Sequence, residues 1–361
     1  MFPILPWCRL ERAYRIGNVE IVPYSGHLDG ADDATQDLLR RVLGTYRNIV
    51  GRPVDRAAVV RYAGTPFGQD LASDILGELY EAVTLACFAS LAGRRFFTPE
   101  ATANSDVFGL FIQRLADPEL IALRTRRRDG HTWSLWPRED VVVTVPVHVS
   151  PVRSVAIDAP LLEALVKRSR LGDADWGRWQ HAIGCFNQGN TDSDAVSYQV
   201  EWGLMCSAFE RLLDAAPSAV DVATKFTETI RPQSTRIARD GPRAPERWKG
   251  ADASLRFEWL REFYRVRGDF AHGRLDTRQP MAWEPLEHLT LAAIGFPLLV
   301  RCLLRAASLY ELTDDDRAGV DAFESFADQP RFLEPPPGSA RGSIDTWWAR
   351  LYQAARLGHT G

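Results

Sequence analysis

The sequence predicts an α+β protein whose first part mixes strands with helices and whose second part is helical. Before about Pro151, β-branched runs bounded by Gly, Asp and Pro are typical of strands. From about Ala159 onward, apolar residues recur at helical spacing instead. We therefore expect a mixed α/β domain of unassigned sensor or regulatory role over residues 1–155 and an all-α four-helix bundle over residues 156–315. A Pro-rich linker and a short C-terminal helix are expected over residues 316–361.

Composition restricts the functions that the chain can have. Of its 361 residues, 45% are hydrophobic and 25% are charged, as in soluble globular proteins. A formal net charge of -4 and a pI near 6.0 exclude nucleic-acid binding through overall charge, so such binding needs a local basic patch. Five widely spaced cysteines predict neither a disulfide framework nor a zinc site.

The chain also shows no signal for a membrane or a cofactor. The start becomes charged too soon for a signal peptide, and the longest apolar run, residues 289–300, is too short for a membrane span. No metal-binding histidine spacing, phosphate-binding loop or dinucleotide-binding glycine motif occurs. We expect a soluble cytoplasmic protein that uses no metal and no cofactor and contacts no membrane.

Several elements are predicted in the first part. Residues 17–24 and 140–150 are strand-like runs, and residues 120–136 predict two strands around an Asp129-Gly130 turn. Between them, a helix is expected over Ala72 to Ala92.

Four amphipathic helices are predicted in the second part. Their apolar stripes are Trp176, Trp179, Ile183 and Phe186; Val200, Leu204, Ala208 and Leu212; Leu255, Trp259, Phe263, Val266 and Phe270; and Leu286, Leu289, Ala293, Phe296 and Val300. Asp173 or Asp175 is expected to cap the first, and Pro297 to kink the last. Arg231 to Gly250 is a Pro- and Gly-rich loop with a local net charge of +4.

An Arg-x4-His pair at the end of the third of these helices is the main candidate site. Arg267 and His272 form it, but the spacing alone is not specific because Arg126 and His131 repeat it across the Asp129-Gly130 turn. The second copy is typical of a solvated hairpin tip. Residues five apart on a straight helix point about 140° from each other. Arg267 and His272 can therefore share a site only if the helix unwinds near Gly268 to Gly273 or a second subunit faces it.

The surrounding sequence adds a family resemblance. "FYRVRGDFAHG", residues 263–273, resembles the motif of the HEPN superfamily, particularly its Apea-like branch. Residues 197–215 and 179–189 resemble the second helix of that family and the helix before it, so the likeness covers roughly residues 173–309. One departure is Gly268, which follows the motif arginine where catalytic members often carry a polar residue.

The resemblance implies a metal-independent endoribonuclease, a toxin or antiviral defence effector that acts as a homodimer with both Arg-His motifs in one cleft. Arg267 would stabilise the phosphate and His272 would transfer a proton, with the 2′-OH of RNA as the attacking group. The first domain would sense a trigger or restrain the second, and an antitoxin or other regulatory partner could act on it. The alternative is a non-catalytic HEPN-like module that binds RNA or a protein partner, in which Gly268 marks lost activity.

Further residues are assigned around this pair. As supporting residues we expect Asp269, Tyr264, Arg265 and Glu210, and as RNA-binding residues Arg261, Arg274, Arg236, Arg239 and Arg243. Asp269 is placed equally well to pair with Arg265 four residues earlier. For Glu210 a structural ion pair is the simpler interpretation. The basic loop residues are equally expected as a solvated surface.

Overall fold

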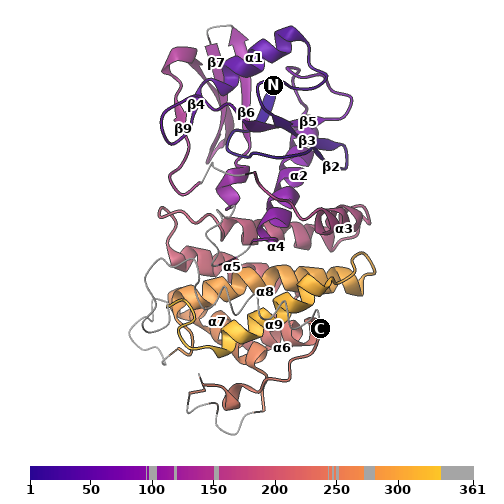
Figure 1. Cartoon of the computed structure of the whole chain (residues 1–361), viewed down its shortest axis with the longest axis vertical. Coiled ribbons are helices and arrows are strands. Elements are labelled where there is room, and N and C mark those ends of the chain that lie inside the picture. Colours follow the sequence, from indigo (N-terminus) through magenta and orange to yellow (C-terminus); the bar gives the residue numbers. More distant parts are fainter. Residues whose placement is uncertain are drawn as a thin grey trace. The chain divides into compact units, whose positions relative to one another are not determined.

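The protein is described here by a computed structural model, which covers residues 1–94, 96, 104–117, 120–149, 154–242, 244–245, 248, 252–271 and 281–334 (Figure 1). The described residues cluster into two compact units. The first comprises Met1–Arg94 and Ala101–Val166, and the second comprises Arg95–Glu100 and the chain from Lys167, so the main boundary falls inside helix α3 (Ala159–Ser169).

The first unit is built on an antiparallel sheet. Its elements are β1 (Phe2–Leu5), β2 (Tyr14–Ile16), β3 (Val19–Tyr24), α1 (Asp33–Leu43), β4 (Tyr46–Arg47), β5 (Ala57–Tyr62), α2 (Ser73–Leu91), η1 (Ser105–Phe108), β6 (Phe111–Asp117), β7 (Leu120–Arg127), β8 (Gly130–Pro137), η2 (Arg138–Asp140) and β9 (Val143–Thr144). The seven-stranded sheet has the order β2-β3-β5-β1-β6-β7-β8, and β4 pairs with β9 in parallel.

Sequence pattern explains why these strands form. In β3, Val19 and Ile21 are buried on one face, and Val22 and Tyr24 are buried on the other, so both faces of the strand contribute to the core. Glu20 lies opposite Arg61 of β5, and their side chains form a 2.6 Å ion pair on the other face. The predicted strand at residues 17–24, the helix at residues 72–92 and the 120–136 hairpin are all confirmed.

The predicted strand over residues 140–150 is wrong for most of its length. Only Val143 and Thr144 form a strand, and Val147 is 84% exposed. Pro146 removes a backbone donor two residues after the strand, so the ladder cannot continue there. β-Branched composition therefore overstated the strand.

The second unit is helical in its described part. It contains α4 (Trp176–Gln188), α5 (Tyr198–Leu212), α6 (Ala219–Thr229), η3 (Ala238–Asp240), α7 (Leu255–Ala271), α8 (Pro285–Ala306) and α9 (Asp314–Asp328). Helix α5 packs on α4, α7 and α8, while α6 packs on α7 and α8, and α9 packs on the same two helices. The fold class is therefore α+β, as predicted.

The helical unit differs in detail from the four expected helices. α6 and α9 were not predicted, although both contribute to the core through Phe226 and Phe323, respectively. The predicted apolar stripe of α5 is correct at Ala208 and Leu212, which are buried, but wrong at Val200, which is 53% exposed. The helix instead buries Trp202 and Phe209, and this larger aromatic pair outweighs the β-branched residue in apolar area.

Helix α8 is the one described helix that is long and apolar enough to cross a membrane. Its 22 residues include a most apolar segment that is 67% buried within the protein. A helix that is apolar on most sides and buried is expected at the core of a soluble protein. Its interior Pro297 lies at a position where α8 continues as helix.

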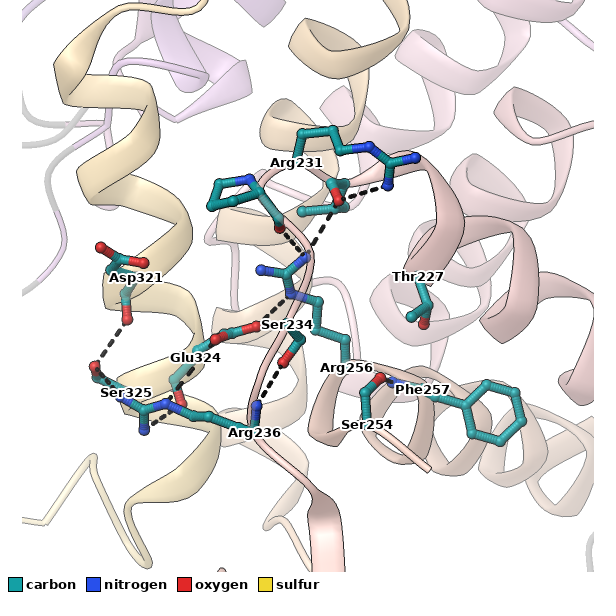
Figure 2. A network of polar contacts seen from close by, with 12 residues as sticks. Thr227, Arg231, Ser234, Arg236, Ser254, Arg256, Phe257, Asp321, Glu324 and Ser325 are labelled. Atoms are coloured by element: carbon teal, nitrogen blue, oxygen red, sulfur yellow. Dashed lines mark hydrogen bonds and ion pairs between the residues drawn. The ribbon is translucent and has the colours of Figure 1, made fainter. Parts of the chain in front are cut away.

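A buried polar network fastens α9 to α7 and to the loop after α6 (Figure 2). The Arg256 guanidinium is 1% exposed and lies 2.5 Å from the Glu324 carboxylate. Its Nη1 also donates to the Pro232 carbonyl at 2.8 Å. Arg236 reaches the same helix and donates to Asp328 and Ser325 at 3.1 and 3.2 Å. The buried Arg256 cation is thereby paired with a carboxylate and a backbone carbonyl.

Candidate active site

Helix α7 positions the predicted site by burying one face against α5. Trp259, Phe263 and Val266 of α7 are each fully buried. Trp202 of α5 stacks on Phe263 with ring centroids 4.8 Å apart, and its indole N–H donates to the Phe263 carbonyl at 2.8 Å. The indole and the aromatic pair fix the rotation of α7 about its axis. Consequently, the side chains one turn further along α7 project toward α5.

One turn later, three side chains form a hydrogen-bonded group that we call the Arg267 cluster: Arg267 and Tyr264 of α7 with Glu210 of α5. Arg267 Nη1 lies 2.7 Å from Glu210 Oε2 and donates to the Tyr264 hydroxyl at 2.9 Å. The same hydroxyl donates to Glu210 Oε2 at 2.5 Å. A charge-assisted triangle of this kind holds all three groups in one arrangement.

The charges of the Arg267 cluster follow from burial and mutual contact. Burial, together with the hydrogen bond to Glu210, raises the pKa of Tyr264 above its usual range. Burial on its own would lower the pKa of Arg267, but Tyr264 and Glu210 outweigh it and raise that pKa instead. Arg267 is therefore cationic and the Tyr264 hydroxyl keeps its proton at neutral pH.

Part of the Arg267 guanidinium remains available. Its side chain is 36% exposed, and both hydrogen bonds use the same nitrogen, Nη1. Among the described residues, none accepts a hydrogen bond from Nε or Nη2. These two nitrogens form an edge of the guanidinium whose geometry matches two oxygens of a phosphate.

The structure brings some of the predicted supporting residues together and separates others. Glu210 and Tyr264 meet Arg267, whereas Asp269 forms a 3.6 Å ion pair with Arg265 on α7 itself. Glu210 does form an ion pair, but with Arg267 across the helix interface. His272 lies outside the described residues, one position after the end of α7.

The predicted RNA-binding arginines are engaged in local ion pairs where they are described. Arg261 lies 2.5 Å from Glu258 on its own helix, and Arg236 belongs to the network with α9. Arg239 pairs with Asp252 and lies 3.5 Å from Asp240. Arg274 and Arg243 lie outside the described residues.

Helix α7 stays helical through Gly268 to Ala271, so no unwinding occurs at the glycine. A side-chain Cβ added at Gly268 would meet no described atom within 4 Å. The glycine is therefore not required by packing within the described part of the chain. Arg267 and His272 can therefore share a site in two ways. Either the chain leaves the helix from His272 onward, or a second subunit faces it.

Sequence reasoning missed the group of packed aromatic side chains that flanks the Arg267 cluster. Phe270 of α7 lies edge-on to Trp202 at 5.2 Å and to Tyr198 at 5.9 Å between ring centroids. Tyr198 is 38% exposed, so this aromatic group reaches the protein surface. The four-residue spacing of Tyr198 and Trp202 at the start of α5 was the available signal.

A pocket elsewhere in the helical unit is lined by cations that local ion pairs explain. It lies where α5, α6 and α8 end, and its cations are already paired. Arg178 lies 2.6 Å from Asp214, and Lys225 lies 3.4 Å from Asp221. Cations near helix C-termini are favoured by the helix dipole, so no ligand is needed to account for them.

Two further observations bear on the site. Within the described ranges, no group of three or more His, Cys, Asp or Glu residues is placed to hold a metal ion. No protein family model, curated protein or solved structure matches this chain.

Proposed function

We propose that the chain is a metal-independent endoribonuclease of the HEPN type, which cuts RNA through Arg267 and His272. One observation carries the proposal: Glu210 and Tyr264 hold the Arg267 guanidinium from one side, while no described residue accepts a hydrogen bond from its other edge. Because the cation is already held in place, little reorganisation of the site is needed when a phosphate binds to its available edge. His272 follows directly after this helix.

The reaction assigned to these residues needs only the groups of RNA and the two side chains. The 2′-OH attacks the adjacent phosphorus, and its proton passes to a base. The bond from phosphorus to the 5′ oxygen breaks, and that oxygen takes a proton from an acid. Products carry a 2′,3′-cyclic phosphate and a 5′-OH. Arg267 offsets charge on the phosphoryl oxygens, and His272 transfers one of the two protons.

The wider biological role follows from the same family interpretation. The enzyme would be a toxin or antiviral defence effector in the cytoplasm, active as a homodimer whose two Arg-His motifs line one cleft. The first unit would sense a trigger, restrain the second unit or receive an antitoxin partner. These roles rest on the resemblance of residues 173–309.

A second candidate is a non-catalytic helical module that binds RNA or a protein. The observation that favours it is the Glu210 carboxylate, which lies against Arg267 and neutralises part of its charge. Gly268, where active relatives often have a polar residue, points the same way. In this case phosphate would bind weakly at Arg267, and no bond would be cut.

The deciding experiment measures cleavage of total RNA and tRNA by the purified protein in excess EDTA. Arg267→Ala and His272→Ala should each lower the rate by at least about a hundredfold, as expected for loss of charge stabilisation or of proton transfer. Matched controls are Arg211→Ala and His181→Ala, exposed residues of α5 and α4 that the mechanism does not use.

The products separate this mechanism from others. Fragments should end in a 2′,3′-cyclic phosphate, and an RNA with a single 2′-deoxy residue should resist cutting at that position. Cleavage that survives both site variants would refute the assignment. RNA binding without cleavage, unchanged in both variants, would favour the non-catalytic module.

A further inference from the structure

We propose that the β7–β8 hairpin of the first unit binds single-stranded nucleic acid, independently of any chemistry at Arg267. The surface concerned, here called the hairpin face, consists of Arg114, Arg124, His131 and Trp133. Arg128 extends it at the hairpin tip, whereas Arg127, three residues after Arg124, projects from the opposite face. The two hairpin strands are joined only by Arg128 and Asp129.

Strand register puts the members of the hairpin face together. Arg124 of β7 lies directly opposite Trp133 of β8, and directly opposed residues of antiparallel strands project from the same face. Position 131 lies two residues before Trp133 and so shares that face. On the third strand, Arg114 of β6 is opposite Ala122, two residues before Arg124.

The side-chain contacts agree with this placement. The Arg114 guanidinium lies over the Trp133 ring, 4.4 Å from its centroid. Asp70 holds Arg114 from the other side at 2.7 Å, with the Arg114 side chain 33% exposed. An arginine fixed against a tryptophan in this way presents a planar stack beside a second cation, Arg124.

The charge of the hairpin differs from that of the whole protein. Residues 123–133 contain four arginines and one aspartate, a net charge of +3 with His131 neutral, whereas the whole chain has -4. At the tip the Arg127 side chain is 68% exposed and lies 4.0 Å from Asp129. The hairpin therefore carries a local positive charge that the chain as a whole lacks, and such a local charge attracts a polyanion.

A solvated basic tip would explain Arg127 and Arg128 but not Arg124. Arg124 is half-buried, and its Nη1 is enclosed without a hydrogen-bond partner among the described residues. An enclosed guanidinium donor without an acceptor is costly. If the Arg124 guanidinium turns outward, a backbone phosphate on the hairpin face supplies that acceptor, while the adjacent Trp133 ring takes a base.

These groups specify the kind of nucleic acid. Arginine forks bind backbone phosphates, and an aromatic ring stacks on a base that is not paired. Neither group distinguishes a ribose from a deoxyribose. We therefore expect oligouridine and oligodeoxythymidine to bind with affinities within about threefold, and a duplex of the same length to bind more weakly.

The test measures fluorescence anisotropy of labelled oligouridine and oligodeoxythymidine with the full chain carrying Arg267→Ala, which keeps RNA intact. Arg124→Gln/Arg128→Gln should weaken binding of both at least fivefold. The slope of log affinity against log salt should fall by about 1.4, or 0.7 for each lost phosphate contact. The matched control is Arg12→Gln/Arg15→Gln, which removes two exposed charges at the other edge strand, β2.

The stacking part is tested at Trp133. Trp133→Leu should weaken binding about tenfold, and Trp133→Phe should restore most of it, as expected for loss and recovery of one stacked base. Trp136→Leu is the control, because Trp136 is 51% exposed but projects from the opposite face. Absence of binding to either oligonucleotide at low salt would overturn the proposal. Equal weakening by the β2 control, or equal affinity for duplex, would overturn it too.

Discussion

Arg267 shows how one side chain can be both paired and available. Glu210 and Tyr264 occupy a single nitrogen of its guanidinium, so the ion pair orients the cation without using its second edge. At 36% exposure, the pair is screened by water, and its contribution to folding stability is about 0–1 kcal/mol. Its larger effect is on the orientation of Arg267 and on the protonation of Tyr264.

The protonation of Tyr264 can be measured directly. Because burial and Glu210 raise its pKa in the folded protein, protonated Tyr264 stabilises the native state. This contribution is fully present below about pH 10, the unfolded value, and is lost as pH rises through the folded pKa. In ultraviolet titration of tyrosinate, the difference between wild type and Tyr264→Phe should appear above the usual range, and Glu210→Gln should move it down.

The control for this titration is Glu228→Gln, an exposed carboxylate of α6. It should leave the Tyr264 transition in place. A Tyr264 transition that does not respond to Glu210→Gln would show that burial alone sets the pKa, and the cluster would then lose its electrostatic role.

At the scale of elements, α9 forms two buried ion pairs, Glu324 with Arg256 of α7 and Asp316 with Arg301 of α8. Arg256 and Glu324 are 1% and 8% exposed, and Figure 2 shows the guanidinium between the α9 carboxylate and the carbonyls that follow α6. Glu324→Ala leaves a buried cation, and we expect the free energy of unfolding in urea to fall by about 3–5 kcal/mol. Replacing both partners, Arg256→Met with Glu324→Leu, should cost less than either single change.

A neighbouring arginine provides the comparison for that prediction. Arg236 contacts the same helix but is 40% exposed, so Arg236→Ala should cost no more than about 1 kcal/mol. Similar losses for Arg236→Ala and Glu324→Ala would mean that burial does not decide the energetics of this network.

Local signals decide which elements could be predicted from the sequence. The 120–136 hairpin has a clear turn dipeptide and the α2 segment a long apolar run, and both are confirmed. Helix α9 has a capping box at Thr313 and Asp316, but its acidic first turn obscured the apolar periodicity. In α5 two overlapping stripes compete, and only packing on α7 and α8 selects the one with Trp202.

The same limit applies to the candidate site. Tyr264 and Arg267 are three residues apart on one helix, so their proximity follows from helical spacing. Glu210 comes from another helix, and its contact with Arg267 depends on the Trp202–Phe263 stack that sets the rotation of α7. Pairing between distant segments is therefore the part that the sequence pattern leaves open.

At the scale of the whole molecule, we propose that a second copy of the chain completes the site. α7 remains helical through Ala271, so Arg267 and the position before His272 follow helical geometry. Residues five apart on a straight helix diverge by about 140°. Under the proposal, a partner subunit supplies the missing half of each site. Specific cleavage activity should then rise with protein concentration as dimers form.

Subunit mixing tests this arrangement most directly. Arg267→Ala and His272→Ala should each be inactive alone, but unfolding and refolding them together should restore cleavage, because mixed dimers carry one intact arginine and one intact histidine in the shared cleft. Refolding either variant with the double variant Arg267→Ala/His272→Ala should restore nothing, since no such dimer holds both groups. If wild type is active while the mixture stays inactive although mixed dimers are present, both residues must act from one chain. The chain from His272 onward would then have to turn back toward Arg267 within the same subunit.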